Sequence, residues 1–233
     1  MTPLFPPLFD GRATAGADPF AAACTEAAAG CDAGLVLYDI GPDTLRAAIV
    51  FAPEVPLRQA MIMQPICGIG FQNALGAVAP PEVSLHLEWQ GGLRLNGARC
   101  GALRSAAASR DPDALPSWLV VALDLHMRSD TEETGLTPDE TTLAAEGCGD
   151  LDPGDLLGAW LRHTLVWINR WEAEGVRPVH DTWTGLAHGL GDMLSLSAYS
   201  GTFRGIDEDF GLLLQQDGDA QIIPLTDILE ETS

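Results

Sequence analysis

Residues 201–218, GTFRGIDEDFGLLLQQDG, decide how the end of the chain folds. Apolar and polar residues alternate in two short runs, and turn-forming residues lie at 200–201, 209–211 and 217–218. Short alternating strands joined by tight turns are typical of small antiparallel barrels. We therefore predict a small β-barrel domain over residues 193–233, appended to a larger unit.

The larger unit is predicted to span residues 18–192 and to contain both strands and helices. Its strand-like stretches lie at 34–40, 44–54, 83–89, 93–107 and 118–127. Its helical stretches lie at 19–29, 55–80 (with a bend at Pro65), 154–175 and 180–191. The strands follow one another mostly as hairpins, which favours an α+β fold: a mixed β-sheet of five or more strands backed by helices. Residues 1–17, rich in Pro, Gly and Ala, are predicted to form an extended arm.

The composition of the chain excludes several classes of partner. The formal charge is −21, while 46% of the residues are hydrophobic and can supply a packed core. Binding to nucleic acid requires a surplus of basic residues, and an anionic membrane repels a strongly acidic protein. We therefore expect neither nucleic acid nor a membrane as a partner.

The chain has no lysine, because all 12 of its basic residues are arginine. Without lysine a protein cannot form a side-chain Schiff base, and it cannot bind phosphate through the ammonium group of a P-loop. Drift in base composition is an alternative origin of this bias, but the chemical exclusion holds in either case.

The sequence predicts a cytoplasmic protein with reduced thiols. The N-terminal stretch MTPLFPPLFDGR has no positive segment and is interrupted by prolines, unlike a signal peptide. No apolar run approaches the roughly 20 residues that span a bilayer. The five cysteines are odd in number and lack C-x-x-C spacing: Cys24, Cys31, Cys67, Cys100 and Cys148.

From about residue 18 the chain resembles the biotin and lipoate protein ligase family. EWQGG (88–92) stands where biotin protein ligases have Lys-Trp-Pro-Asn-Asp, and LNGARCGAL (95–103) resembles the hairpin that follows that motif. LVVALDLHM (119–127) resembles the Gly-x-Gly-Ile-Asn strand, and RWEAEGVRPVHDTW (170–183) the end of the ligase catalytic domain. Residues 201–218 resemble the SH3-like C-terminal domain. The resemblance implies the fold described above and names biotin, lipoate or octanoate, and ATP as the family's ligands.

The chain departs from the family at the positions that handle ATP. The family's long Gly-Arg-rich loop is replaced by a Gly-Pro-Asp turn at 41–43, with only Arg46 nearby. The motif lysine is Glu88, Trp89 is kept, and Pro-Asn-Asp has become 90–92, Gln-Gly-Gly. The second lysine of the family corresponds to Arg99. In the Gly-Ile-Asn strand, an Asp and a His replace Gly and Asn.

These losses argue against ordinary ligation. One preorganised donor at a developing charge is typically worth about 3 to 4 kcal/mol, and several are absent here. Glu88 would in addition repel phosphate. We therefore predict no cofactor and no efficient ATP-dependent ligase activity.

The same residues suggest a remaining ligand pocket. Arg46 and Arg99 could hold a carboxylate with Trp89 as one wall, beside Asp124 and His126. The alternative is a collapsed site in which Arg99 pairs with Glu88 or Asp124. The full set of candidates is Arg46, Glu88, Trp89, Arg99, Cys100, Asp124 and His126.

Four of these candidates also have a purely structural interpretation. Cys100 could accept an acyl group or be a buried structural thiol. Asp124 and His126 share one face of a strand, as an acid–base pair or as a simple hydrogen-bonded pair. Glu88 could be a catalytic carboxylate or a solvated strand end. The histidines at 163, 180 and 188 lack metal spacing, so we predict no metal site.

Two classes of function remain open. One is a binding module for a small carboxylate or acyl ligand, or for a protein partner, built on a ligase-like fold. The other is an enzyme: an active ligase, or an ATP-independent acyl transferase that uses non-standard residues.

Overall fold

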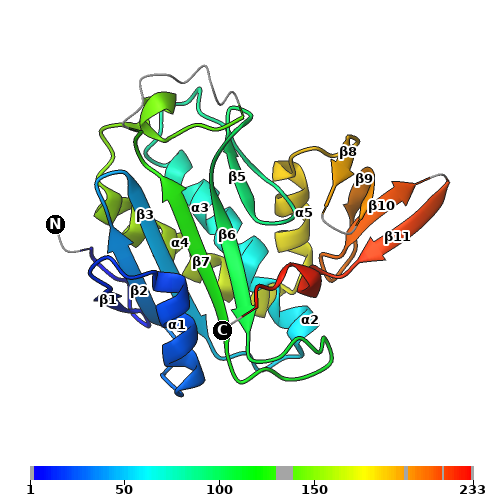
Figure 1. Ribbon diagram of the computed structural model, residues 1–233, viewed down its shortest axis with the longest axis horizontal. Coiled ribbons are helices and arrows are strands. Elements are labelled where there is room, and N and C mark those ends of the chain that lie inside the picture. The colour runs from blue at the N-terminus through cyan, green and yellow to red at the C-terminus, as the bar shows by residue number, and fades with distance from the viewer. Residues whose placement is uncertain (1–2, 130–138, 197–198, 217, 232–233) are drawn as a thin grey trace.

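The computed structural model describes residues 3–129, 139–196, 199–216 and 218–231. Its main feature is a 7-stranded mixed sheet in the order β1-β2-β3-β7-β6-β5-β4 (Figure 1). β1 pairs with β2 in parallel, and the other neighbours are antiparallel. The strands are β1 (Asp10–Ala13), β2 (Leu35–Ile40), β3 (Thr44–Phe51), β4 (Leu85–Leu87), β5 (Gly92–Leu95), β6 (Ala98–Ala107) and β7 (Leu119–His126). The predicted α+β fold with five or more strands is confirmed.

Turn chemistry fixes the hairpins of this sheet. β5 and β6 are joined by Asn96 and Gly97, whose φ angles are 49° and 97°. A two-residue turn of type I′ requires positive φ at both positions, and Asn-Gly is among the pairs that adopt it most readily. The Gly-Pro-Asp turn at 41–43 joins β2 to β3 in the same tight manner, with the Gly41 N–H donating to the Thr44 carbonyl at 2.9 Å.

Helices cover the two faces of the sheet unequally. Behind it lie α2 (Leu57–Ala60), α3 (Met63–Gly76), α4 (Pro153–Glu174) and α5 (Arg177–Leu186), and in front lies α1 (Pro19–Ala28) (Figure 1). Alternate residues of each strand face the two layers, as β geometry requires. Leu45 and Ile49 of β3 pack in the large core with α3 and α4, whereas Ala48 and Val50 pack in the smaller core with α1.

Three segments differ from the sequence prediction. The apolar stretch 55–80 is two helices, and the break falls between α2 and α3 and not at Pro65. Pro65 lies in the first turn of α3, where its missing N–H removes no intrahelical bond. Residues 10–13, predicted to belong to an arm, form the edge strand β1 of the main sheet. The expected loop at 129–150 contains a short helical turn, η1 (Ala144–Cys148), and 130–138 of that loop lie outside the described residues.

The C-terminal segment forms a second, smaller sheet. Its strands are β8 (Met193–Ser195), β9 (Ser200–Ile206), β10 (Leu212–Gln216) and β11 (Asp219–Ile223), in the order β11-β10-β9-β8 and all antiparallel. A 3₁₀ turn, η2 (Leu225–Ile228), follows. Phe203, Phe210 and Leu212 belong to the same core as α3 and α4, so the small barrel-like unit packs directly on the main domain. The predicted boundaries at 17 and 192 stay a prediction.

Among the described helices, none combines the length and the apolar character that a bilayer span requires.

Candidate functional site

The EWQGG stretch forms a tight turn between β4 and β5. The Gly91 N–H donates to the Glu88 carbonyl at 2.9 Å, and the Leu103 N–H of β6 donates to the Gly91 carbonyl at 2.7 Å. Gly91 has a φ of 98°, and a Cβ there would lie 2.4 Å from the Leu103 carbonyl oxygen. A Cβ on Gly92 would lie 2.0 Å from a carboxylate oxygen of Glu88. The glycine pair therefore allows the turn to pack against β6 and leaves room for the Glu88 carboxylate.

Glu88 is bound by two arginines. Its carboxylate forms ion pairs with the Nε of Arg94 and with a terminal nitrogen of Arg99, one on each oxygen. Burial raises the pKa of Glu88, but the bonds from Arg94 and Arg99 outweigh burial and hold the pKa below its ordinary value. Glu88 is thus a charged strand-end residue that is paired with two arginines. Arg99, which corresponds to the second lysine of the family, is occupied by the Glu88 carboxylate. This is the collapsed arrangement that the sequence left open.

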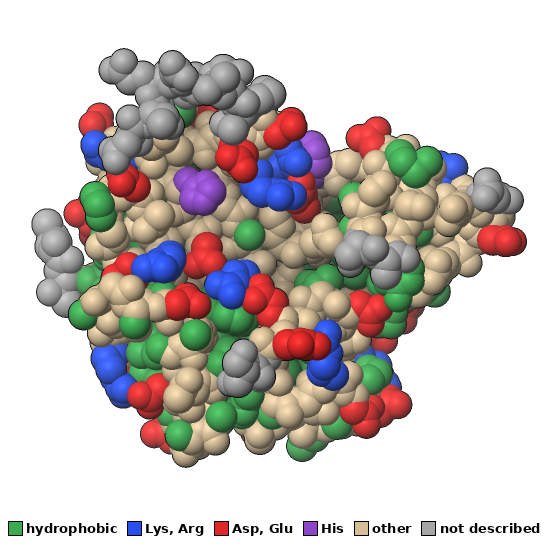
Figure 2. Space-filling view, in the orientation of Figure 1, with side chains coloured by type: hydrophobic (Ala, Val, Ile, Leu, Met, Phe, Trp, Pro, Cys, Tyr) green, Lys and Arg blue, Asp and Glu red, His purple; other side chains and the backbone are tan. Residues whose placement is uncertain are grey.

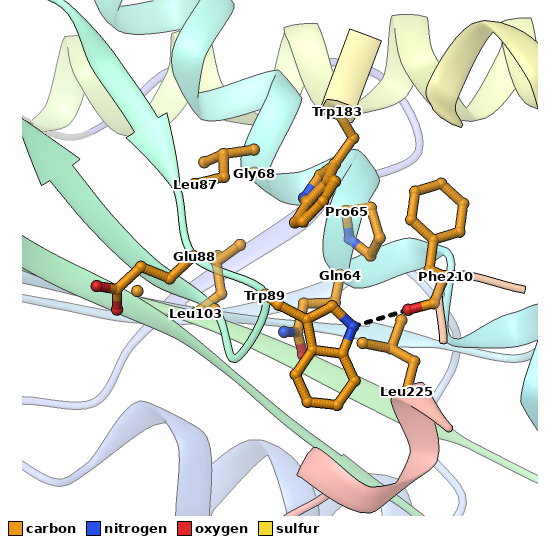
Figure 3. Close-up of a pocket in the computed structure, with 12 residues that line it drawn as sticks. Gln64, Pro65, Gly68, Leu87, Glu88, Trp89, Leu103, Trp183, Phe210 and Leu225 are labelled. Carbon is orange, nitrogen blue, oxygen red and sulfur yellow. Dashed lines mark hydrogen bonds between the residues drawn. The ribbon is translucent and has the colours of Figure 1, made fainter. Parts of the chain in front are cut away.

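Trp89 does not line an open pocket. Its side chain is 5% exposed, and its Nε1 donates to the Phe210 carbonyl of the C-terminal unit at 2.7 Å (Figure 3). Phe210 has a φ of 61°, and its ring meets Trp183 of α5 edge-to-face at 6.3 Å. The prediction that Trp89 is a ligand wall does not match this geometry, because the indole is used to join the two sheets.

The hollow beneath the turn is nearly filled. It has a volume of about 10 Å³, about the room that one water needs. In Figure 3, Trp89 and Trp183 point into it, while the Glu88 carboxylate points away. The other side chains that line it come from α3, β4, β6 and the C-terminal unit: Gln64, Pro65, Leu87, Leu103, Phe210 and Leu225. This hollow has no room for a biotin-sized molecule.

Three of the predicted residues do share the front face of the sheet. Arg46 of β3 stands opposite Asp124 of β7 in the strand register, and His126 follows two residues later. Arg46 donates to Asp39 of β2 at 2.7 Å. His126 is exposed. Figure 2 shows acidic and basic side chains lying side by side across the middle of this face.

The sequence reasoning missed the central basic residue of that face. Arg104 of β6 extends from the sheet beside Asp124, at 3.4 Å from its carboxylate, and its guanidinium stacks on the Phe20 ring at 4.3 Å. Burial raises the pKa of Asp124, against the opposing charge of Arg104. The signal was present in the sequence, because Arg104 interrupts the run of small and apolar residues at 100–107.

Cys100 faces the helices and is fully buried. Its Sγ lies 3.5 Å from the Leu93 carbonyl, and burial raises its pKa to about 12. A thiol of this kind stays protonated near neutral pH and is a poor nucleophile. The arrangement therefore favours the structural alternative for Cys100. Within the described part of the chain, no group of three His, Cys, Asp or Glu residues is placed to hold a metal ion.

Comparison with known proteins decides the family. The model of the Biotin/lipoate A/B protein ligase family matches residues 5–185. The chain belongs to this family. A second model, described as a Domain of unknown function (DUF4444), matches residues 190–231 and so covers the small sheet.

Individual relatives agree with this assignment. A biotin--[acetyl-CoA-carboxylase] ligase of Paracoccus denitrificans is 22% identical over 186 residues, which is 77% of each chain. A crystal structure of a biotin protein ligase-like protein of unknown function from Silicibacter sp. TM1040 is 55% identical, with a TM-score of 0.93 over 99% of this chain and 100% of that one. Biotin protein ligase from Aquifex aeolicus has the same fold, with a TM-score of 0.72 at 15% identity over 93% of this chain and 96% of that one.

Proposed function

We propose that this ligase-family chain does not perform ATP-dependent ligation and instead binds a small carboxylate or acyl ligand. The observation that supports this most strongly is the pairing of Glu88 with Arg94 and Arg99 at the place of the family's lysine motif. A carboxylate already bound by both nearby guanidinium groups leaves no free cation there for an α-phosphate.

The other positions at which the family binds ATP also argue against ligation. The β2–β3 connection is a short turn at 41–43, and the nearby Arg46 donates to Asp39 at 2.7 Å. The chain offers no lysine to replace these groups. Each missing donor is typically worth about 3 to 4 kcal/mol of transition-state stabilisation, so several missing donors reduce the rate by many orders of magnitude.

The second half of the proposal, binding of a carboxylate ligand, rests on the front face of the sheet. Arg46 and Arg104 both lie on that face; Arg46 is engaged by Asp39, so the proposal rests on Arg104, because an arginine can hold a carboxylate bidentately. A formal charge of −21 disfavours nucleic acid and anionic membranes as partners, and no bound cofactor is required. The five free cysteines fit a reducing, cytoplasmic location. A protein ligand on the same face is the other form of this proposal.

Retained ligase activity is the second candidate, and the relative in Paracoccus denitrificans, a biotin--[acetyl-CoA-carboxylase] ligase, favours it. Acyl transfer through Cys100 is disfavoured, since that thiol is fully buried and has a raised pKa.

Two binding measurements test the proposal. Calorimetric titration with Mg-ATP should give no heat beyond dilution. Thermal unfolding with biotin, lipoate or octanoate should show that at least one acid raises the melting temperature, because a ligand at 100 times its Kd adds about 2.7 kcal/mol of stability. Saturable ATP binding, or no shift with any carboxylate, would contradict the respective half of the proposal.

A further inference from the structure

The end of the chain returns from the small sheet to the front face of the main sheet. After η2, Leu229 is 4% exposed, and its carbonyl accepts a bond from Arg110 at 2.9 Å. The Glu230 N–H donates to the Ser105 carbonyl of β6 at 2.8 Å. Figure 1 shows this red segment crossing from η2 to β6. We call residues 229–231 the C-terminal strap.

The strap places a carboxylate on Arg104. Both oxygens of Glu230 accept bonds from the guanidinium, from Nε and from a terminal nitrogen, each at 2.8 Å. Two parallel bonds of this kind are how an arginine recognises a free carboxylate ligand. The other terminal nitrogen of Arg104 lies 3.4 Å from Asp124 and 3.8 Å from Asp18. On one side the guanidinium is held by Asp124 and Asp18, and on the other its hydrogen-bond donors are bound by Glu230 of the strap.

A cleft opens beside this pair. It has a volume of about 400 Å³, within the usual range of small-molecule sites. Phe20 and Cys24 of α1, with Trp118 next to β7, form apolar walls, while Arg104 lines the cleft together with the carboxylates of Asp18, Glu230 and Glu231. An apolar surface adjacent to one bidentate arginine suits a ligand that has an apolar body and a single carboxylate.

We propose that Glu230 occupies Arg104 as an internal substitute for such a ligand, and that a monocarboxylate with an apolar body displaces the strap to bind in this cleft. The inference rests on the proposed function and assigns its site. It places the ligand's carboxylate on Arg104, a residue outside the vestigial lysine motif.

The charges around Arg104 explain why an exchange is feasible. Three carboxylates, from Asp18, Asp124 and Glu230, surround one guanidinium. A ligand without displacement would add a fourth negative charge, which Coulomb repulsion disfavours. Replacing the Glu230 carboxylate by that of the ligand keeps the charge constant and buries apolar surface against Phe20 and Trp118.

The test compares two charge-matched variants. Glu230→Gln weakens the bond to Arg104, whereas Glu231→Gln makes the same charge change at a neighbouring residue that also lines the cleft. Calorimetric titration with octanoate and with phenylacetate should give a Kd about tenfold or more lower for Glu230→Gln than for Glu231→Gln, since a charge-assisted bond is worth about 1.5–3 kcal/mol. Octanamide and phenylacetamide should not distinguish the two variants.

Amide deuterium exchange and an Arg104 variant complete the test. In the wild type, saturating octanoate should speed deuterium exchange at the Glu230 amide, which bonds to Ser105, because the strap has left β6. Arg104→Gln should abolish carboxylate binding while its circular dichroism stays native. If that variant does not fold, the comparison of the two glutamine variants decides alone.

The inference is overturned if both glutamine variants bind the acids equally, or neither binds, or the amides show the same difference. A wild-type thermal shift with equal affinities of the variants would leave the proposed function standing and remove only this site. ATP-dependent ligation would instead remove the proposed function and leave the comparison of variants intact.

Discussion

Trp89→Phe should destabilise the protein strongly although Trp89 belongs to the vestigial ligase motif. In the wild type the buried indole donates to the Phe210 carbonyl at 2.7 Å. The phenylalanine ring cannot donate, so a buried acceptor loses its partner at a cost of about 1–3 kcal/mol. The lost ring volume adds roughly 1 kcal/mol, at about 24 cal/mol per Å³ of cavity. We expect a total loss of about 2–4 kcal/mol in the free energy of unfolding.

Urea unfolding followed by circular dichroism measures this loss, provided that the m-value stays constant. Trp171→Phe is the matched control, because Trp171 is only partly buried on α4 and packs at the margin of the core. We expect the control to lose less than about 1 kcal/mol. If Trp89→Phe and Trp171→Phe unfold at the same urea concentration, the indole does not join the two sheets and the structural explanation for its presence is wrong.

Three further predictions concern the same region and the thiols. The pKa of Glu88 is held low, so its contribution is present above the ordinary carboxyl pKa and is lost as pH falls. The unfolding free energy should therefore drop below about pH 5, and Glu88→Gln should flatten that part of the profile; identical profiles would refute the pairing. Gly91→Ala should cost about 1–3 kcal/mol more than Gly97→Ala in urea, because both residues have positive φ but only Gly91 faces a backbone oxygen, at 2.4 Å. Iodoacetamide should label the partly exposed Cys31 in the native protein and Cys100 only after unfolding, and peptide mass spectrometry that finds Cys100 labelled first would contradict its burial.

Local patterns were sufficient to predict most of the fold. Alternation identified the strands β2, β3, β6 and β7, and the Asn96-Gly97 pair identified the tight β5–β6 turn. Strand periodicity and turn chemistry are properties of neighbouring residues, so a single sequence contains them. The strand β1, with the sequence DGRA, has no apolar alternation, and only its parallel partner 25 positions later makes it a strand.

The site was predicted in part, for a related reason. The pairing of Arg99 with Glu88 was one of two stated alternatives, and the residues are only 11 positions apart, within the consecutive strands β4 to β6. The bond from Trp89 to Phe210 spans 121 positions, and that from Arg104 to Glu230 spans 126. Contacts of that separation depend on how the small sheet docks on the main domain, which no local pattern specifies.

Release of pyrophosphate from ATP tests the central claim most directly. The purified protein would be incubated with Mg-ATP and, in turn, biotin, lipoate and octanoate, beside an active biotin protein ligase as the positive control. The account predicts no release above the rate without acid, because the lysine motif is replaced by Glu88 bound to Arg94 and Arg99. Acid-dependent release that disappears in Arg99→Ala would contradict it.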